Sequence, residues 1–392
     1  MEVMVETCCG IDVHQKSIVC CILSGPLDTN KPHKLYRTFG TTTKQLYQAL
    51  NWLNENHVTH VFFESTGQYW VPLFNIFSDS SLELILANPQ HIKNLPGRKT
   101  DMNDAEWIAQ LGRCGLIQAS YIPNAEVQQL RLLTRRRKAY TERITQCKNE
   151  IHNILQRANI KLTSYLSDIY GKTGTALLQL FIDGVVISVE SIMPILHGKV
   201  KASPEKLVEA MDGKLSIEDR FLLGQSLDYF QFLKAQLNEV QILIEKYIQE
   251  HFPLEYALLL EIPGVSKIIA AVILGEIGPN VEAFVSEAHL ASWAGVCPGS
   301  YESAGVKKSS RTTQGNRFLK TALFQAGGTA GRSKDEGFHS FYGRISNRGS
   351  KMKAIIACAH KLLRIIYKIL STKCHYDTKK ALGLRQQTRA IA

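Results

Sequence analysis

The sequence predicts an α/β amino-terminal domain followed by a mainly helical remainder. Short apolar runs alternate with helical segments before Pro89, which is typical of a mixed sheet with helices on its faces. From Ala125 onward, apolar residues recur at steps of three and four, as they do along long helices. We therefore expect a sheet domain at residues 1–124, a helical region at 125–252, a carboxyl-terminal domain at 253–372 and a basic tail at 373–392.

The composition is that of a globular protein with more than one domain. The chain has 392 residues, of which 45% are hydrophobic and 21% are charged, and this length exceeds what one ordinary core holds. The longest strictly apolar run, at 268–274, is too short to span a bilayer, and residues 1–7 lack the basic start of a signal peptide. Nine cysteines form no Cys-x-x-Cys pair, which disfavours a structural zinc site. We expect a cytoplasmic protein with reduced thiols and no membrane partner.

Positive charge is concentrated at one end of the chain. The formal net charge is +11, yet from Tyr301 onward 19 Lys and Arg residues face only 4 Asp and Glu residues. Such a concentrated surplus is typical of a protein that binds a polyanion, although a membrane surface or an acidic protein could use the same charge.

The expected strands and helices of the first domain can be placed individually. Two apolar runs separated by a short turn predict a hairpin, and three further runs follow it. Helices are expected after the capping threonines at 41–43 and over 68–78. The five strands are expected at residues 8–12, 18–23, 34–39, 58–63 and 82–87.

Two acidic residues fall where predicted strands end. Asp12 closes the first strand, and Glu64 follows the fourth. In a mixed sheet of this kind the fourth strand can lie beside the first, and ligands collect at the carboxyl ends of strands. We therefore expect Asp12 and Glu64 to meet at one edge of the sheet.

Two more acids occur at the start of a predicted helix. Residues 99–105 are expected to open this helix with Thr100 as the N-cap, so that Asp101 and Asp104 share one face. Acids also favour helix N-termini because of the helix dipole alone. Four carboxylates close together require cations, and two Mg2+ ions about 4 Å apart are the usual clamp for in-line chemistry at phosphate.

The middle of the chain has the pattern of two long helices. Apolar residues at heptad spacing predict an antiparallel, coiled-coil-like pair, joined by a mostly helical connection. Leftover apolar surface would pair with another protomer, while a hairpin within one chain is the alternative. Among the heptad positions of the first helix, which form its seam, Arg137 is the one charged residue. The seams are Leu130, Leu133, Arg137, Tyr140, Ile144, Cys147, Ile151, Ile154 and Ala158, and Phe230, Leu233, Leu237, Val240, Ile244 and Tyr247.

A glycine-containing turn opens the third region. Gly264 precedes an apolar helix that starts at Lys267, and Gly275 and Gly278 follow near its end. This pattern is similar to a helix-hairpin-helix turn, whose backbone N–H groups approach a phosphate without reading bases. A plain αα-hairpin fits the same residues.

A loop rich in glycine and serine, residues 293–305, is followed by a basic helix. A serine flanked by flexible backbone and cations suits nucleophilic attack on a phosphodiester, although most such loops are only connections. Ser300, Ser303, Ser309 and Ser310 are the candidates. The polar residues expected to contact nucleic acid here are Lys307, Lys308, Arg311, Asn316, Arg317 and Lys320, in addition to Gly264 and Lys267.

Two further helices are expected at residues 333–347 and 351–369, with basic residues between them. The tail from Lys373 is polar and basic, and we expect it to be poorly ordered.

Three motifs of the first domain resemble those of a known family. Gly10-Ile11-Asp12-Val13-His14, Phe63-Glu64-Ser65-Thr66-Gly67 and Lys99-Thr100-Asp101-Met102-Asn103-Asp104-Ala105 are similar to the DEDD motifs of one class of bacterial insertion-sequence transposase. The resemblance implies a RuvC-like, ribonuclease H-like domain in which Asp12, Glu64, Asp101 and Asp104 bind divalent metal beside DNA.

The carboxyl-terminal region carries the second half of this resemblance. Pro298, Glu302, Ser303, Ala304 and Gly305, followed by Gly315-Asn316-Arg317-Phe318-Leu319, resemble the serine loop of the same transposases. The resemblance makes Ser303 the nucleophile, with Glu302 replacing a serine that is often found at that position.

The resemblance implies a DNA recombinase that moves its own insertion sequence through a phosphoserine intermediate. It further implies an element-encoded guide RNA, double-stranded donor and target DNA, two Mg2+ ions and a dimer or tetramer located with the bacterial nucleoid. Two other functions fit the residues. One is a metal-only endonuclease of the Holliday-junction-resolvase kind, and the other is a non-enzymatic DNA-bridging protein.

Overall fold

The computed structural model divides the chain into two compact units, Met1–Ile122 and Pro123–Ala392. The described residues are 2–28, 31–65, 67–89, 92, 103–198, 200–299, 301–303, 306–309 and 311–383, and for 301–303, 306–309 and 381–383 the description covers the backbone only.

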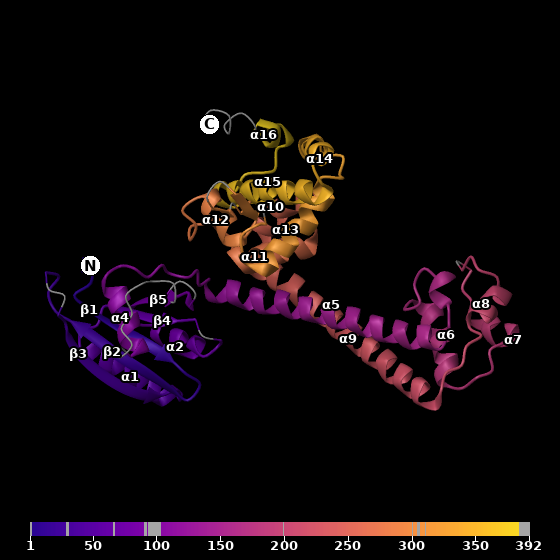
Figure 1. The fold of residues 1–392 in the computed structure, drawn as a ribbon, viewed down its shortest axis with the longest axis horizontal. Coiled ribbons are helices and arrows are strands. Elements are labelled where there is room, and N and C mark those ends of the chain that lie inside the picture. Colours follow the sequence, from indigo (N-terminus) through magenta and orange to yellow (C-terminus); the bar gives the residue numbers. More distant parts are fainter. Residues whose placement is uncertain are drawn as a thin grey trace. The chain divides into compact units, whose positions relative to one another are not determined.

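The first unit is built on a five-stranded mixed sheet in the order β3-β2-β1-β4-β5 (Figure 1). Strands β1 to β3 form an antiparallel meander, whereas β1, β4 and β5 run parallel to one another. All five predicted strands are confirmed, and the sheet agrees with the expected ribonuclease H-like layout. Their bounds are β1 Thr7–Val13, β2 Ser17–Ser24, β3 His33–Gly40, β4 His60–Glu64 and β5 Glu83–Ala87.

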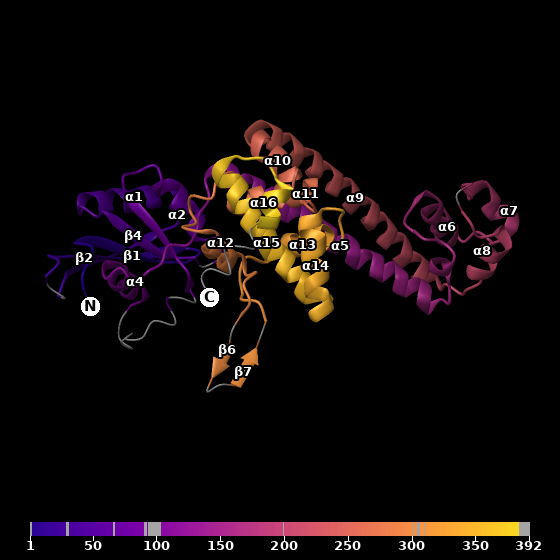
Figure 2. The same cartoon turned by 90° about the horizontal axis from the view of Figure 1, so that it is seen from above.

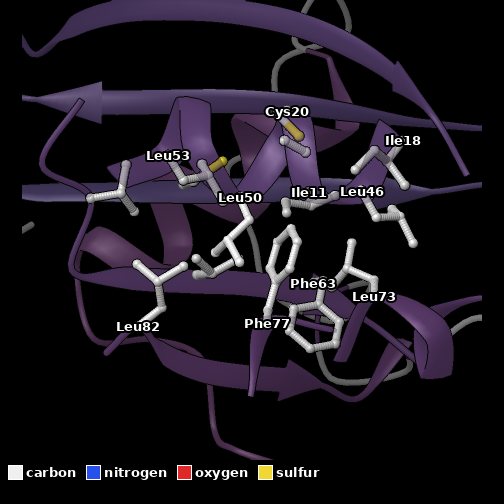
Figure 3. Packing of buried hydrophobic residues seen from close by; sticks show 14 of the residues in the cluster. Ile11, Ile18, Cys20, Leu46, Leu50, Leu53, Phe63, Leu73, Phe77 and Leu82 are labelled. Carbon is white, nitrogen blue, oxygen red and sulfur yellow. The ribbon is translucent and has the colours of Figure 1, made fainter. Parts of the chain in front are cut away.

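Helices α1 (Thr43–Glu55) and α2 (Trp70–Phe77) cover one face of the sheet. Alternate residues of β1, β2 and β4 point toward them and form an apolar core (Figure 3). Fully buried examples are Ile11, Ile18 and Phe63. The side chains of the intervening residues in the same strands therefore point to the opposite face of the sheet.

Helix α4 (Asp104–Arg113) covers that opposite face, where Cys8, Cys21 and Phe62 belong to its core. The sequence predicted that Asp101 lies in the first turn of this helix, but the helix begins three residues later, at Asp104. Asn103, with an extended backbone, is the N-cap and accepts a hydrogen bond from the Ala105 N–H at 2.9 Å. The prediction that Thr100 caps this helix is therefore wrong, because the N-cap is Asn103.

In the second unit, two long helices run side by side in opposite directions, α5 (Ala125–Arg157) and α9 (Ile217–His251) (Figure 1). The Cys147 thiol donates to the carbonyl oxygen of Ser226 at 3.0 Å, and the Tyr247 hydroxyl donates to that of Glu126 at 3.2 Å, which fixes the antiparallel direction. The predicted antiparallel pair is confirmed. Its association with another protomer remains a prediction.

The connection between α5 and α9 is helical, as predicted, and packs at one end of the pair (Figure 1). Its apolar side chains, including Leu177, Leu178 and Leu207, form a core with the second half of α5 and the first half of α9. The elements are η1 Leu162–Ser164, α6 Lys172–Ile182, α7 Val189–Ile192, η2 Met193–Ile195 and α8 Pro204–Ala210.

The remaining helices of the second unit pack beside the start of α5 and the end of α9 (Figure 1). A two-stranded antiparallel hairpin, β6 (Tyr301–Ser303) and β7 (Val306–Ser309), extends from this group (Figure 2). In the described part of the chain, no helix is long and apolar enough to cross a membrane. The helices are α10 Pro253–Leu260, α11 Lys267–Ile277, α12 Glu287–Ala294, α13 Arg317–Ala330, α14 Glu336–Arg348, α15 Lys351–Thr372 and α16 Thr378–Gly383.

The tail as far as Gly383 is bound to the helices, so the expectation of poor order is wrong for residues 373–383. The Lys373 ammonium donates to Glu255 Oε1 at 2.8 Å, and the Tyr376 hydroxyl donates to Asp335 Oδ2 at 3.1 Å. Composition alone did not reveal these acceptors, because they lie on helices distant in sequence. The last residues, 384–392, lie outside the described part.

Candidate functional site

The structure places Asp12 and Glu64 at the same edge of the sheet. The parallel register of β1 and β4 ends with Ile11 opposite Phe63, so Asp12 and Glu64 are the next residues on neighbouring strands. Side chains alternate between the two faces of a strand, and Asp12 and Glu64 come two residues after Gly10 and Phe62. Both acids therefore lie on the face of the sheet that α4 covers. The sequence-based expectation that these strand ends adjoin is consistent with this register.

Helix α4 brings Asp104 toward the same edge. At the end of the helix, the carbonyl oxygen of Arg113 accepts a hydrogen bond of 2.8 Å from the N–H of Met4, which precedes β1. At the start of the helix, the first turn passes over Gly10 in β1. A Cβ atom on Gly10 would lie 2.1 Å from the carbonyl oxygen of Ala105. The helix therefore runs antiparallel to β1, and Asp104 at its start lies toward the carboxyl end of that strand.

The fourth predicted acid, Asp101, lies outside the described residues. Within the described part, no group of three or more His, Cys, Asp or Glu side chains is arranged to hold a metal ion. Asp12 Oδ2 lies 3.0 Å from His14 Nε2 on the neighbouring turn. Carboxylate oxygens from β1, β4 and α4 are the ligand type that Mg2+ prefers, so the donor chemistry at this edge fits that ion.

A further acid, Glu106, fixes the start of α4 to the sheet. The Lys34 ammonium and the Tyr36 hydroxyl, both on β3, donate hydrogen bonds to its carboxylate. Burial acts to raise the pKa of Glu106, but these two hydrogen bonds outweigh it and hold the pKa below its usual value. The sequence analysis missed Glu106, although an acid two residues after Asp104 on an amphipathic helix is a usable signal.

The predicted nucleophile, Ser303, is the last residue of β6 and pairs with Val306 of β7. The sequence predicted a loop here, and the structure shows a short hairpin. Its stem is closed by an isolated bridge between Pro298 and Thr312, and the Gly299 N–H donates to the carbonyl oxygen of Arg311 at 2.9 Å. Ser309 ends β7, while Ser300 and Ser310 lie outside the described residues.

Two glycines allow the stem of this hairpin to form. Gly295 ends α12 in the left-handed conformation, with φ of 71°, and a Cβ atom on Gly315 would lie 2.4 Å from the Gly295 nitrogen. The chain entering the hairpin and the chain leaving it therefore touch through backbone atoms. A side chain at position 315 would push the two segments apart.

Asn316 connects this stem to a buried ion pair. Its Oδ1 atom caps α13 by accepting from the N–H groups of Phe318 and Leu319, both at 3.0 Å. Its Nδ2 atom donates to Glu276 Oε2 at 2.6 Å. Glu276, on α11, has no exposed surface and also receives two hydrogen bonds of 2.9 Å from the guanidinium of Arg135.

The other residues predicted to bind nucleic acid occupy varied environments. Gly264 has φ of 84° and packs against the backbone of α13, which accounts for glycine at this position without a ligand. Lys267 and Arg317 are exposed at the starts of α11 and α13. The Lys320 ammonium donates to the carbonyl oxygen of Thr313 at 2.9 Å. Arg311 follows β7, while Lys307 and Lys308 lie within it.

Sequence reasoning missed Glu276 as the centre of this network. A carboxylate inside the otherwise apolar helix α11 was the available signal, because a buried acid requires partners. Its partner Arg135 belongs to a run of charged residues, and such a run is ordinarily a solvated helix face. The sequence therefore did not indicate that Arg135 pairs with a buried acid.

Comparison with known proteins gives matches in both units. A family model for the DEDD transposases of IS110 elements, described as "Transposase", matches residues 9–160. A second model, described as "Transposase IS116/IS110/IS902 family", matches residues 256–343. The chain is also similar to the pilin gene-inverting protein of Moraxella bovis, at 33% identity over 127 residues, or 31% of this chain and 39% of that protein.

A third match is the insertion element IS110 uncharacterized 43.6 kDa protein of Streptomyces coelicolor, at 29% identity over 39% of this chain and 35% of that protein. The aligned regions thus span less than half the length of these relatives. Among solved structures, a RuvC structure of Thermus thermophilus aligns with 30% of this chain and 84% of its own, at 13% identity and a TM-score of 0.22. The two family models match the sheet domain with the first long helix and the carboxyl-terminal helices, and this chain belongs to the IS110 family of transposases.

Proposed function

We propose that this protein is a DNA transposase that excises and inserts its own insertion sequence by cleaving and rejoining DNA strands. The observation that carries the proposal is the register of β1 and β4, which puts Asp12 and Glu64 side by side at the edge toward which α4 directs Asp104. Family membership and the positive surplus after Tyr301 support DNA as the substrate.

In this proposal Ser303 supplies the nucleophile. Its Oγ atom attacks the scissile phosphorus, a new P–O bond forms to the serine, and the deoxyribose oxygen leaves with a proton. The phosphodiester energy is kept in the phosphoserine bond, so a second deoxyribose hydroxyl can later displace the serine and rejoin the strand. Support comes from the position of Ser303 in a hairpin whose flanking residues include Lys307, Lys308 and Arg311.

We assign Asp12, Glu64, Asp101 and Asp104 as the residues that would hold divalent metal, most simply two Mg2+ ions. When bound, the metal would supply positive charge that polarises the phosphate and stabilises the leaving oxygen. The carboxylates would hold the ions, and α4 sets the position of Asp104 through its packing on Gly10.

We further propose that the protein works with an RNA and with further copies of itself. An element-encoded structured RNA would guide the protein to donor and target DNA, and the basic carboxyl-terminal region offers charge for two polyanions. Exposed apolar side chains on α9, such as Phe221, Tyr229 and Phe232, support association with further protomers. RNase treatment should abolish activity on purified DNA if the RNA is required.

The test is a search for protein attached covalently to DNA. Purified full-length protein is incubated with Mg2+, the noncoding RNA of its element and labelled donor and target duplexes, and the products are separated on a denaturing gel. A labelled adduct that is absent in Ser303→Ala and in Asp104→Asn supports the proposal. A matched control is Ser309→Ala, which changes another serine of the same hairpin and should keep the adduct.

The alternatives give different outcomes. A metal-only endonuclease would cut the DNA without any adduct and would tolerate Ser303→Ala. A DNA-bridging protein would do neither and would keep its binding after Asp104→Asn. Full adduct formation by Ser303→Ala would reject the serine mechanism outright.

A further inference from the structure

A cavity of about 320 Å3 opens among α5, α9, α11 and α13 in the second unit. Ligand pockets in proteins commonly enclose about 300–1,000 Å3, so this one is large enough for a small ligand. Its apolar wall includes Ile244, Ile269, Val272 and Ala322, and Phe318 lies beside them. Its lining contains no described residue of the Ser303 hairpin.

Arg137 lines this cavity, and one of its donor groups has no acceptor in the described part of the chain. It occupies the seam between α5 and α9, where the other positions are mostly apolar. Its Nε atom is buried, and no described residue accepts a hydrogen bond from it. Burial also lowers the pKa of Arg137 below its ordinary value, as expected for a guanidinium partly withdrawn from water. A ligand that supplies an acceptor would satisfy the buried Nε–H group.

The charges around the cavity leave a positive surplus. Lys138 and Lys267 join Arg137 in the lining, which also contains the carboxylates of Glu142, Glu245 and Glu276. Lys138 Nζ lies 3.7 Å from Glu142 Oε1, and Arg135 neutralises Glu276. Among the remaining charged residues of the lining, Arg137 and Lys267 exceed Glu245 by one positive charge. Arg131, which lies 3.4 Å from Glu276 Oε2, adds to this surplus. The negative charge of a phosphodiester group would offset it.

We propose that this cavity binds one nucleotide of a single-stranded nucleic acid, with its phosphate on Arg137 and its base against the apolar wall. Arg137 suits the phosphate, because guanidinium groups bind phosphate in charge-assisted hydrogen bonds. The apolar wall suits the base, because bases pack on apolar and aromatic side chains without sequence preference. The inference rests on the proposed function in one respect, that the protein acts on nucleic acid.

Calorimetric titration of the full-length protein with thymidine 5′-monophosphate, and anisotropy titration with a fluorescein-labelled oligothymidine, test this assignment. We expect saturable binding of the mononucleotide. Arg137→Gln should weaken it by about tenfold or more, since it removes a charge-assisted hydrogen bond. Arg136→Gln is the matched control, because Arg136 is adjacent and exposed but does not line the cavity. It should change the affinity less than twofold.

Two further variants separate binding from folding. Gln325→Trp places a large ring at an exposed residue of the lining and should block the mononucleotide while leaving the thermal midpoint unchanged. Arg137→Leu removes an unpaired, partly buried charge from the helix seam, so it should raise the thermal midpoint of the free protein and abolish binding. A lower midpoint for Arg137→Leu would contradict the unsatisfied buried donor on which the inference depends.

Several results would overturn the assignment. These are no binding of the mononucleotide, equal losses in Arg136→Gln and Arg137→Gln, or inorganic phosphate binding as tightly as the nucleotide, which would leave a simple anion site. Failure of the proposed function is distinguishable, because Ser303→Ala should bind the mononucleotide like the unaltered protein. Binding without any covalent DNA adduct would keep the cavity assignment and reject the serine chemistry.

Discussion

Asn316 donates a 2.6 Å hydrogen bond from Nδ2 to Glu276 Oε2, across a separation of 40 residues in the sequence. The same asparagine caps α13 through its Oδ1 atom, and the same glutamate is neutralised by Arg135 of the long helix α5. One buried carboxylate thus ties together α5, α11 and the chain that leaves the Ser303 hairpin. A fully buried acid is tolerated here because each oxygen has a charged or polar donor.

Glu276→Gln should destabilise the protein by about 1–3 kcal/mol, because it leaves Arg131 and the partly exposed Arg135 without their shared counter-charge. Chemical denaturation monitored by circular dichroism measures this effect. Glu282→Gln changes an exposed acid shortly after α11 and is the matched control, with little expected effect. If the two variants unfold at the same denaturant concentration, the network is not a stabilising one.

Gly10→Ala should disrupt the packing of α4 on the sheet. The added Cβ would lie 2.1 Å from the Ala105 carbonyl oxygen and 2.4 Å from the Ala109 nitrogen, so the helix must shift. Overpacking of this kind commonly destabilises by about 1–3 kcal/mol or more. DNA cleavage should fall as well, because the same helix carries Asp104.

The control for this change is Gly343→Ala on α14, where a Cβ meets nothing within 4 Å. Alanine is the better helix former by about 0.5–1 kcal/mol, so this variant should be slightly more stable than the unaltered protein. Equal stability of the two variants would mean that α4 does not press on β1.

Glu106→Gln should destabilise the first unit by about 1–3 kcal/mol near neutral pH, since two hydrogen bonds to a buried carboxylate are weakened. The folded-state pKa of Glu106 lies below its ordinary value of 4.5. Its contribution is therefore fully present above pH 4.5 and is lost as the pH falls below that value toward the folded-state pKa. Urea denaturation at several pH values should show the variant and the unaltered protein converging on the acidic side, and a constant difference would contradict the assignment.

Removal of divalent metal should abolish DNA cleavage and adduct formation together, because the proposed carboxylates repel the phosphate unless cations neutralise them. Chelation with EDTA followed by added Mg2+ should restore both, as followed on the denaturing gel. Asp12→Asn should require more Mg2+ than the unaltered protein. Cleavage that persists in excess EDTA would exclude the assigned role of the acids.

Local pattern was sufficient for the framework of both units. The alternating apolar residues of β1, β2 and β4 predicted a sheet with two covered faces, and the heptad spacing predicted α5 and α9 as an antiparallel pair. Such patterns are readable because the period of side-chain burial follows directly from strand and helix geometry. The motif that carries Asp12 and the one that carries Ser303 also indicated the family from sequence.

Features that depend on distant partners were not readable in the same way. Asn103 rather than Thr100 caps α4, although both residue types make good caps and only the path of the chain into the helix selects one of them. The ordered tail depends on Glu255 and Asp335, which lie far from it in sequence.

The sequence by itself determined which segments form strands and helices, which acids end them, and to which family the chain belongs. Only the tertiary structure decided that Glu276 is buried between Arg135 and Asn316, and that the Nε atom of Arg137 lines a cavity without an acceptor among the described residues. The physical reason is that hydrophobic periodicity is a local property of the chain, whereas the pairing of a buried charge is set by side chains brought together from separate helices.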